Sequence, residues 1–276
     1  MFSFNCKGRL LTFNEPIVMG IINTTPDSFY ARSRKTAVDA ALLRAEEMLK
    51  DGATFIDVGG QSTRPRSERV SEPDEAARVL PVIEALVKQF PDCLISIDTF
   101  YARVAKDAVE AGAMLVNDVS AGTIDPDLLA TVASLNVPYV LMHKQGTLES
   151  MHVNPTYKNV VTDVFDFFSF KLKELYALGL HDVILDPGFG FGKTARHNFT
   201  LLKHLSFFQE FQKPILVGLS RKATVYKTLG ITAEDALNGT TVLNTIALQN
   251  GASILRVHDV KEAKEAIRLM QEYNNA

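Results

Sequence analysis

The stretch Ile17-Val18-Met19-Gly20-Ile21-Ile22-Asn23 is an apolar run that stops at one polar residue. The same pattern recurs seven more times along the chain. The eight runs are Ile17–Ile22, Thr54–Ile56, Leu94–Ile97, Met114–Val116, Tyr139–Met142, Val183–Leu185, Ile215–Leu219 and Ile254–Leu255. Continuous runs of Val, Ile and Leu are typical of parallel strands that are covered on both faces. The pattern therefore predicts eight buried parallel strands.

Between consecutive runs there is room for at least one helix. Helical patterns cover Thr36–Lys50, Pro73–Phe90, a segment opened by Asp125-Pro126, Val161–Leu175, Asp235–Asn250 and Val260–Glu272. Eight strand–helix units predict an α/β fold, a (β/α)₈ TIM barrel. Residues 2–14 alternate apolar and polar around Lys7-Gly8, which predicts a short N-terminal β-hairpin that plugs the N-terminal end of the barrel.

Length and composition fit this architecture. A chain of 276 residues without repeats or linkers is normal for one barrel, so residues 1–276 are expected to form a single domain. The net charge of −3 gives no reason to expect nucleic acid or a membrane surface as a partner. The N-terminus lacks the pattern of a signal peptide, and the two cysteines suggest no disulfide framework. We therefore expect a cytoplasmic protein.

The polar residues that end the runs should meet at one mouth, because the active site of a (β/α)₈ barrel lies at the C-terminal ends of its strands. They are Asn23, Asp57, Asp98, Asn117, His143, Asp186, Ser220 and Arg256. Carboxylates, amides and cations gathered in this way predict a catalytic site. For His143, a place at the mouth and a structural role are both open.

Two long connections, at residues 23–35 and 59–72, follow early strands and are typical of binding loops. The first opens with Asn23-Thr24-Thr25-Pro26-Asp27-Ser28-Phe29, whose composition alone fits a capped turn. The second contains Gly59-Gly60-Gln61-Ser62-Thr63-Arg64-Pro65. Its glycines permit close approach of a ligand, and its hydroxyls and Arg64 suit an anion.

The segment Asp186-Pro187-Gly188-Phe189-Gly190-Phe191-Gly192-Lys193 does not have the spacing of a nucleotide-binding loop. Pro187 stands where a P-loop needs glycine, and Lys193 stands where the dinucleotide fingerprint needs its third glycine. What remains is a carboxylate at a strand end, followed by a loop with two aromatic rings. One of Phe189 and Phe191 is expected to be a packing residue.

Ser220-Arg221-Lys222 and Arg256-Val257-His258-Asp259 follow the last two strands. Because side chains alternate along a strand, Arg256 and His258 should point the same way. Together with Lys222 they form a group of cationic or protonatable side chains that predicts a phosphate or diphosphate site.

Seven motifs in order make the chain resemble the dihydropteroate synthase family of pterin-binding barrels. They are Asn-x-Thr-Pro-Asp-Ser-Phe, Gly-Gly-x-Ser-Thr-Arg-Pro, Ser-Ile-Asp-Thr, Asn-Asp-Val, Asp-Pro-Gly-Phe-Gly-Phe-Gly-Lys, Ser-Arg-Lys and Arg-Val-His. The resemblance extends from Met19 to Asp259. It implies a transferase of folate biosynthesis that condenses (7,8-dihydropterin-6-yl)methyl diphosphate with 4-aminobenzoate, giving 7,8-dihydropteroate and diphosphate. It also implies Mg²⁺ as cofactor, a homodimer and a target for sulfonamides.

The resemblance also implies roles for individual residues. Asp98, Asn117, Asp186 and Lys222 would bind the pterin. Thr63, Arg64, Arg256 and His258 would bind the diphosphate, and Asn23 would help to hold Mg²⁺. Pro65, Phe191 and Ser220 would contact 4-aminobenzoate, while Asp98, Lys222 and Arg256 would act in catalysis.

The chain departs from the family pattern at Tyr30 to Arg34 in the first loop, at Gln61 where glutamate is common, and at Arg66 where glycine is common. Two rival functions remain. A pterin-binding methyltransferase domain would not need the Ser-Thr-Arg-Pro loop or the Arg-Val-His cluster. A non-catalytic pterin-binding protein is compatible with Arg66 beside the aminobenzoate pocket.

Overall fold

The computed structural model describes residues 1–24, 34–61, 69–147, 151 and 155–276. Eight parallel strands stand in the order β8-β7-β6-β5-β4-β3-β10-β9, and a bridge between Leu185 and Ile215 joins the two ends of the sheet. The strands are β3 (Ile17–Asn23), β4 (Phe55–Gly59), β5 (Leu94–Asp98), β6 (Leu115–Asp118), β7 (Tyr139–Met142), β8 (Val183–Asp186), β9 (Leu216–Val217) and β10 (Ile254–Val257). The predicted TIM barrel is confirmed.

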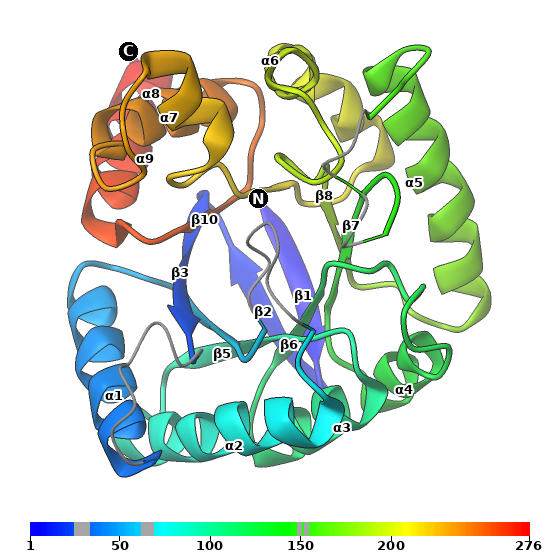
Figure 1. The fold of residues 1–276 in the computed structure, drawn as a ribbon, viewed down its shortest axis with the longest axis vertical. Helices are drawn as coiled ribbons and strands as arrows, with labels where there is room; N and C mark the ends of the chain where they lie inside the picture. The colour runs from blue at the N-terminus through cyan, green and yellow to red at the C-terminus, as the bar shows by residue number, and fades with distance from the viewer. Residues whose placement is uncertain (25–33, 62–68, 148–150, 152–154) are drawn as a thin grey trace.

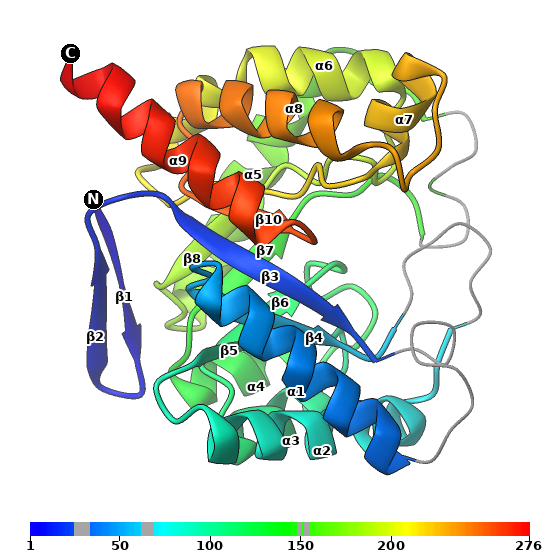
Figure 2. The ribbon, with the colours of Figure 1, turned by 90° about the vertical axis from the view of Figure 1, so that its left-hand side faces the viewer.

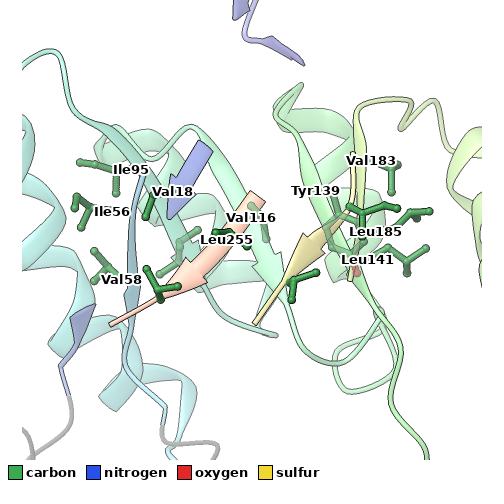
Figure 3. Close-up of a cluster of buried hydrophobic side chains, with 14 of the residues drawn as sticks. Val18, Ile56, Val58, Ile95, Val116, Tyr139, Leu141, Val183, Leu185 and Leu255 are labelled. Carbon is green, nitrogen blue, oxygen red and sulfur yellow. The ribbon is translucent and has the colours of Figure 1, made fainter. Parts of the chain in front are cut away.

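Helices surround the barrel (Figure 1). They are α1 (Arg34–Lys50), α2 (Glu72–Gln89), α3 (Ala102–Ala111), α4 (Leu128–Leu135), α5 (Val160–Ala177), α6 (Ala195–Lys203), the 3₁₀ helix η1 (Leu205–Phe211), α7 (Ala223–Leu229), α8 (Leu237–Gln249) and α9 (Val260–Asn275). Alternate strand residues, among them Val18, Ile56 and Val116, belong to the large apolar cluster that packs against these helices (Figure 3). None of the described helices is both long and apolar enough to span a bilayer.

One predicted helix start is wrong. Asp125-Pro126 does not open a helix, since α4 begins at Leu128. The Asp125 carboxylate instead accepts hydrogen bonds from the backbone N–H of Ala102, at 2.7 Å, and of Asp127. A tertiary contact to the start of α3 therefore uses the side chain that the local sequence offered as a cap.

The interior of the barrel has an apolar layer at its N-terminal end. Inward-facing residues of the strands and Phe4 of the hairpin form it: Phe4, Ile17, Met19, Phe55, Leu115, Val140, Ile184, Leu216 and Ile254. The antiparallel hairpin of β1 (Phe2–Cys6) and β2 (Arg9–Phe13) lies at this end of the barrel (Figure 2). Its ring of Phe13 packs against Phe55, with centroids 6.3 Å apart. The predicted plug is confirmed.

Candidate active site

A polar layer lies two residues further along the same strands. Side chains point alternately to the two faces of a strand, so the residue two positions after an inward-facing one also points inward. Phe55 is followed in this way by Asp57, Leu115 by Asn117, Ile184 by Asp186 and Ile254 by Arg256, while Asp98 ends β5. The structure brings these polar side chains together at the C-terminal mouth.

Arg256 connects two carboxylates across the mouth. Its Nε donates to Asp57 Oδ2 at 2.7 Å, and its Nη2 donates to Asp98 Oδ2 at 2.6 Å. Asn117 Nδ2 donates to the same oxygen of Asp57 at 3.0 Å. The sequence had placed Asp57 at the mouth without a role, whereas the structure makes it the centre of this network.

Burial shifts the acidity of the mouth carboxylates. It raises the pKa of Asp98 to about 7, opposed by the neighbouring Arg256 guanidinium. It also raises the pKa of Asp186, opposed by Lys222, while Asp186 Oδ1 accepts a hydrogen bond from Gly188 N–H at 2.7 Å. Buried carboxylates held beside cations are a common feature of binding and catalytic sites. Here they can accept hydrogen bonds from the N–H groups of a flat polar ligand.

Lys222 lies at the other side of the mouth. Its Nζ donates to the carbonyl of Phe189 at 2.6 Å and lies 4.6 Å from the centroid of the Phe191 ring. Burial lowers the pKa of Lys222 to about 8, opposed by Asp186. Phe189 is fully buried in the main core, which confirms that one of the two phenylalanines is a packing residue. Phe191 keeps some exposure beside the ammonium group.

The glycine-rich segment after β8 packs its backbone against the segment after β7. Gly188 and Gly192 have φ of +69° and +64°, and a side chain at either position would meet the backbone of His143 or Gln145. Lys193 Nζ donates to the carbonyls of His143, Gly188 and Phe191 at 3.0 to 3.2 Å. The glycines and the lysine thus join two loops. Sequence reasoning missed this role for Lys193.

Lys193 and His143, which join the two loops, are both buried. Burial lowers the pKa of Lys193 to about 7 and holds the pKa of His143 well below its usual range. His143 Nδ1 lies 2.9 Å from Lys193 Nζ, and the imidazole packs edge-on against Phe167. Of the two roles open for His143, the structural one agrees with these contacts.

The two late motifs bind each other. His258 N–H donates to Ser220 Oγ at 3.1 Å, and the same hydroxyl lies 3.0 Å from His258 Nδ1. Arg221 makes two hydrogen bonds of 2.9 Å to the carboxylate of Asp259. This bidentate ion pair joins the segment just before α7 to the segment just after β10. The sequence gave no signal for it, because the partners are separated by 38 residues.

His258 is a neutral donor. Burial and the adjacent Arg256 lower its pKa to about 4. Because Ser220 Oγ already accepts one hydrogen bond, its own O–H can donate to Nδ1, and we assign the ring proton to Nε2. The expected anion site therefore has Arg256 and Lys222 as cations and His258 as a neutral hydrogen-bond donor.

Asn23 ends β3 beside Gly59 of β4. Within the described part of the chain, its side chain makes no hydrogen bond, and no group of three His, Cys, Asp or Glu side chains could hold a metal ion. Mg²⁺ often binds through one or two protein oxygens, water and substrate phosphates. The available Asn23 amide fits this kind of site.

The second long loop is fastened at both ends. The carbonyl of Gly60 accepts a hydrogen bond from Arg78 at 3.0 Å, and Gln61 Oε1 accepts one from Val70 N–H at 2.7 Å. Beneath Gly60 lies Glu75, fully buried, and burial raises its pKa to about 8. Thr63, Arg64 and Pro65, to which the family resemblance gives substrate-binding roles, lie outside the described residues.

Comparisons with known proteins place this site in context. The sequence profile of the family described as pterin binding enzyme matches residues 19–258. Dihydropteroate synthase of Haemophilus influenzae is 41% identical over 98% of both chains. A crystal structure of Yersinia pestis dihydropteroate synthase with a sulfonamide drug complex superposes with a TM-score of 0.93 at 41% identity, over the full length of both chains. The Xanthomonas albilineans enzyme in complex with 7,8-dihydropteroate superposes with a TM-score of 0.89 at 38% identity, over 99% of both.

Proposed function

The chain belongs to the pterin binding enzyme family and is a transferase that makes dihydropteroate in folate biosynthesis, and from this premise we propose how its residues share the reaction. The observation that carries the proposal is the layer of Asp57, Asp98, Asn117, Asp186 and Arg256 inside the barrel mouth. This layer combines carboxylates that can accept hydrogen bonds from the pterin ring with the Arg256 guanidinium, which can stabilise the departing diphosphate.

The pterin lies in the mouth, between the ends of β5, β6 and β8. Asp186 and Asp98 accept hydrogen bonds from its amino and ring N–H groups, and Asn117 contacts the same edge. Lys222 donates to the ring carbonyl. The support is the position of these groups at the C-terminal ends of strands in one sheet and the burial of Asn117 and Asp186. Low exposure strengthens each of these hydrogen bonds, because water competes less for the donors.

The diphosphate lies further out, against Arg256 and the Nε2–H of His258, with Thr63 and Arg64 contributing from the second loop. Asn23 and the diphosphate oxygens would hold Mg²⁺. When bound, the metal ion supplies positive charge to the departing diphosphate. Arg256 stabilises the same leaving group, as preorganised donors do for developing charge.

Departure of the diphosphate leaves a cationic pterin methylene. Asp98 in its ionised form, paired with Arg256, stabilises this cation electrostatically, and Lys222 holds the ring in place. The arylamine nitrogen then attacks the methylene carbon to form the new C–N bond, and it loses one proton to water to give dihydropteroate. A neutral arylamine is already nucleophilic, so the site needs no strong general base.

4-Aminobenzoate lies at the outer rim, against Phe191, Pro65 and Ser220. The position of Phe191 supports a contact with 4-aminobenzoate, since its ring lies beside Lys222 at the edge of the proposed pterin site. The Ser220 hydroxyl is held by His258, so it borders both the diphosphate and the aminobenzoate. We extend sulfonamide binding to this rim, because the Yersinia pestis relative was solved with a sulfonamide drug complex.

We also propose a single-domain protein that forms a homodimer in the cytoplasm. The helices α6, α7, α8 and α9 adjoin one another (Figure 2). Together with η1 they carry exposed apolar side chains: Phe199, Phe207, Leu229, Val242, Leu269 and Tyr273. A second copy is the simplest partner for such a surface. Both cysteines are free thiols, as a reducing compartment requires. Sedimentation equilibrium measures the assembly directly.

The decisive experiment is single-turnover release of diphosphate from the pterin substrate. With Mg²⁺ and 4-aminobenzoate, the protein should release diphosphate and form dihydropteroate in equal amounts. A methyltransferase domain or a non-catalytic pterin-binding protein would bind the pterin and release no diphosphate. Chelation of the metal should stop turnover, and unchanged turnover would refute the proposed role of Mg²⁺.

A further inference from the structure

We propose that Asp57 is a positioning residue that orients Asn117 toward the pterin and Arg256 toward the diphosphate through one shared carboxylate oxygen. The inference rests on the proposed function, in that it takes Asn117 and Arg256 as substrate-binding residues. Asp57 itself is fully buried, so it acts through these two neighbours and does not touch the substrates.

The contact to Asn117 determines which end of its amide a ligand meets. An ionised carboxylate has only acceptors, so the amide atom beside Asp57 Oδ2 must be the nitrogen. The Asn117 oxygen is then the atom left for the pterin, whose edge carries N–H donors. Without Asp57 the two amide orientations would differ little in free energy, and one of them would present a donor to a donor.

The contact to Arg256 fixes the plane of the guanidinium group. Asp57 Oδ2 binds Nε at 2.7 Å, the end of the fork nearest the side-chain stem. Asp98 binds Nη2 at 2.6 Å. Two carboxylates on neighbouring strands β4 and β5 thus hold one planar group at two points. If Asp98 turns toward the pterin, the bond to Asp57 alone still holds Arg256 in place for the diphosphate.

The second carboxylate oxygen of Asp57, Oδ1, makes it possible to remove the charge of Asp57 and still keep the acceptor at Oδ2. Oδ1 is buried and has no hydrogen-bond partner among the described residues. An asparagine at position 57 can therefore place its single oxygen where Oδ2 lies and accept from both donors, with its NH₂ group in the unpartnered position. Asp57→Asn should keep both orientations, and Asp57→Ala should lose both.

A matched control stands on the neighbouring strand β6. Asp118 is also a fully buried carboxylate at a strand end, but it accepts hydrogen bonds from Ser120 and Gly122 N–H and from the Tyr139 hydroxyl. Its side chain makes no hydrogen bond to Asn117 or Arg256. Asp118→Asn should lower the melting temperature and change the two ligand affinities much less than Asp57→Ala does, because Asp118 acts on the site only through its charge near Asp98.

The test is calorimetric titration of the folded full-length variants with two separate probes: 6-hydroxymethyl-7,8-dihydropterin, and inorganic diphosphate with Mg²⁺. Asp57→Ala should weaken both by about tenfold or more, the scale expected when a buried charged hydrogen-bond partner is removed. Asp57→Asn should stay within about threefold of wild type for both, since both orientations are retained. If Asp57→Ala does not fold, Asp57→Ser replaces it, because its short side chain cannot reach both donors.

A double-mutant cycle adds a readout that general destabilisation cannot imitate. If Asp57 acts through Asn117, Asn117→Ala should cost pterin affinity in the wild type and almost none in Asp57→Ala. Additive losses, or wild-type affinity of Asp57→Ala for both probes, would overturn the proposal. So would a loss in Asp57→Asn equal to that in Asp57→Ala. Wild-type protein that binds neither probe would instead refute the functional assignment itself.

Discussion

The two ends of the barrel interior are built from the same strands and differ completely in chemistry. Phe55 and Asp57 are two residues apart on β4, as are Ile184 and Asp186 on β8. The first of each pair joins an apolar layer sealed by the hairpin, and the second joins the charged mouth. Burial of apolar surface stabilises the fold, whereas burial of charge opposes it. The barrel therefore gains its interior stability at one end and places its chemistry at the other.

A substitution at the apolar end should therefore lower the stability of the fold and leave the activity unchanged. Phe55→Ala should lower the free energy of unfolding by about 3–5 kcal/mol, because it removes a fully buried ring and leaves a cavity. The kcat/KM of the folded fraction should stay within about threefold of wild type, since the mouth is untouched. Urea titration and steady-state kinetics measure the two quantities. A large loss of activity without a loss of stability would break the division between the two ends.

Two lysines, one near each end of the barrel, should differ in the same way. Lys193 joins the loops of the mouth through three carbonyls, while Lys213 donates to the single carbonyl of His181, near the hairpin end. Lys193→Met should cost about 1–3 kcal/mol of stability, because buried carbonyls lose their donor. It should also raise the KM for 4-aminobenzoate, since Phe191 loses an anchor. Lys213→Met should change stability by less than about 0.5 kcal/mol and leave KM unchanged. Equal effects of the two variants would contradict this account.

Glu75 offers a smaller effect that depends on pH. Its pKa rises from 4.5 to about 8 on folding, so the folded state binds more protons between these values, and stability contributed by Glu75 is lost as pH rises through 8. Glu75→Gln removes this loss. At pH 9 the variant should be more stable than wild type by about 1–2 kcal/mol, and the advantage should shrink toward pH 5. Glu84→Gln, at an exposed position of the same helix, is the control and should follow wild type. A pH-independent difference for Glu75→Gln would contradict the burial of an ionisable carboxyl.

The sequence predicted what depends on local pattern. The apolar runs predicted the strands and the residues that end them. Both the alternation of side chains along a strand and the position of its end depend on residues that are neighbours in the sequence. Partners distant along the chain could not be predicted. Lys193 meets His143 across 50 residues, and Arg221 meets Asp259 across 38. Asp125 divides its carboxylate between the local Asp127 N–H and the distant Ala102 N–H of α3, and the second contact could not be predicted for the same reason.

The protonation states were also beyond the sequence. His258 stands in a motif rich in cations, yet burial beside Arg256 leaves it neutral. Asp57 was recognised as a strand end, but its role depends on two donors that approach from β6 and β10. Charge at such a site is decided by three-dimensional neighbours, which a single sequence does not reveal.

The most direct test of the division between the two ends is calorimetric titration of the dihydropterin into Asp186→Ala and Phe55→Ala. Asp186→Ala should lose about 3–5 kcal/mol of pterin binding, the cost of removing one partner from a buried charged contact, with a melting temperature close to wild type. Phe55→Ala, measured where it is folded, should bind the pterin as wild type does despite its lower melting temperature. Pterin affinity of Asp186→Ala within threefold of wild type would contradict the assignment of the charged mouth as the substrate site.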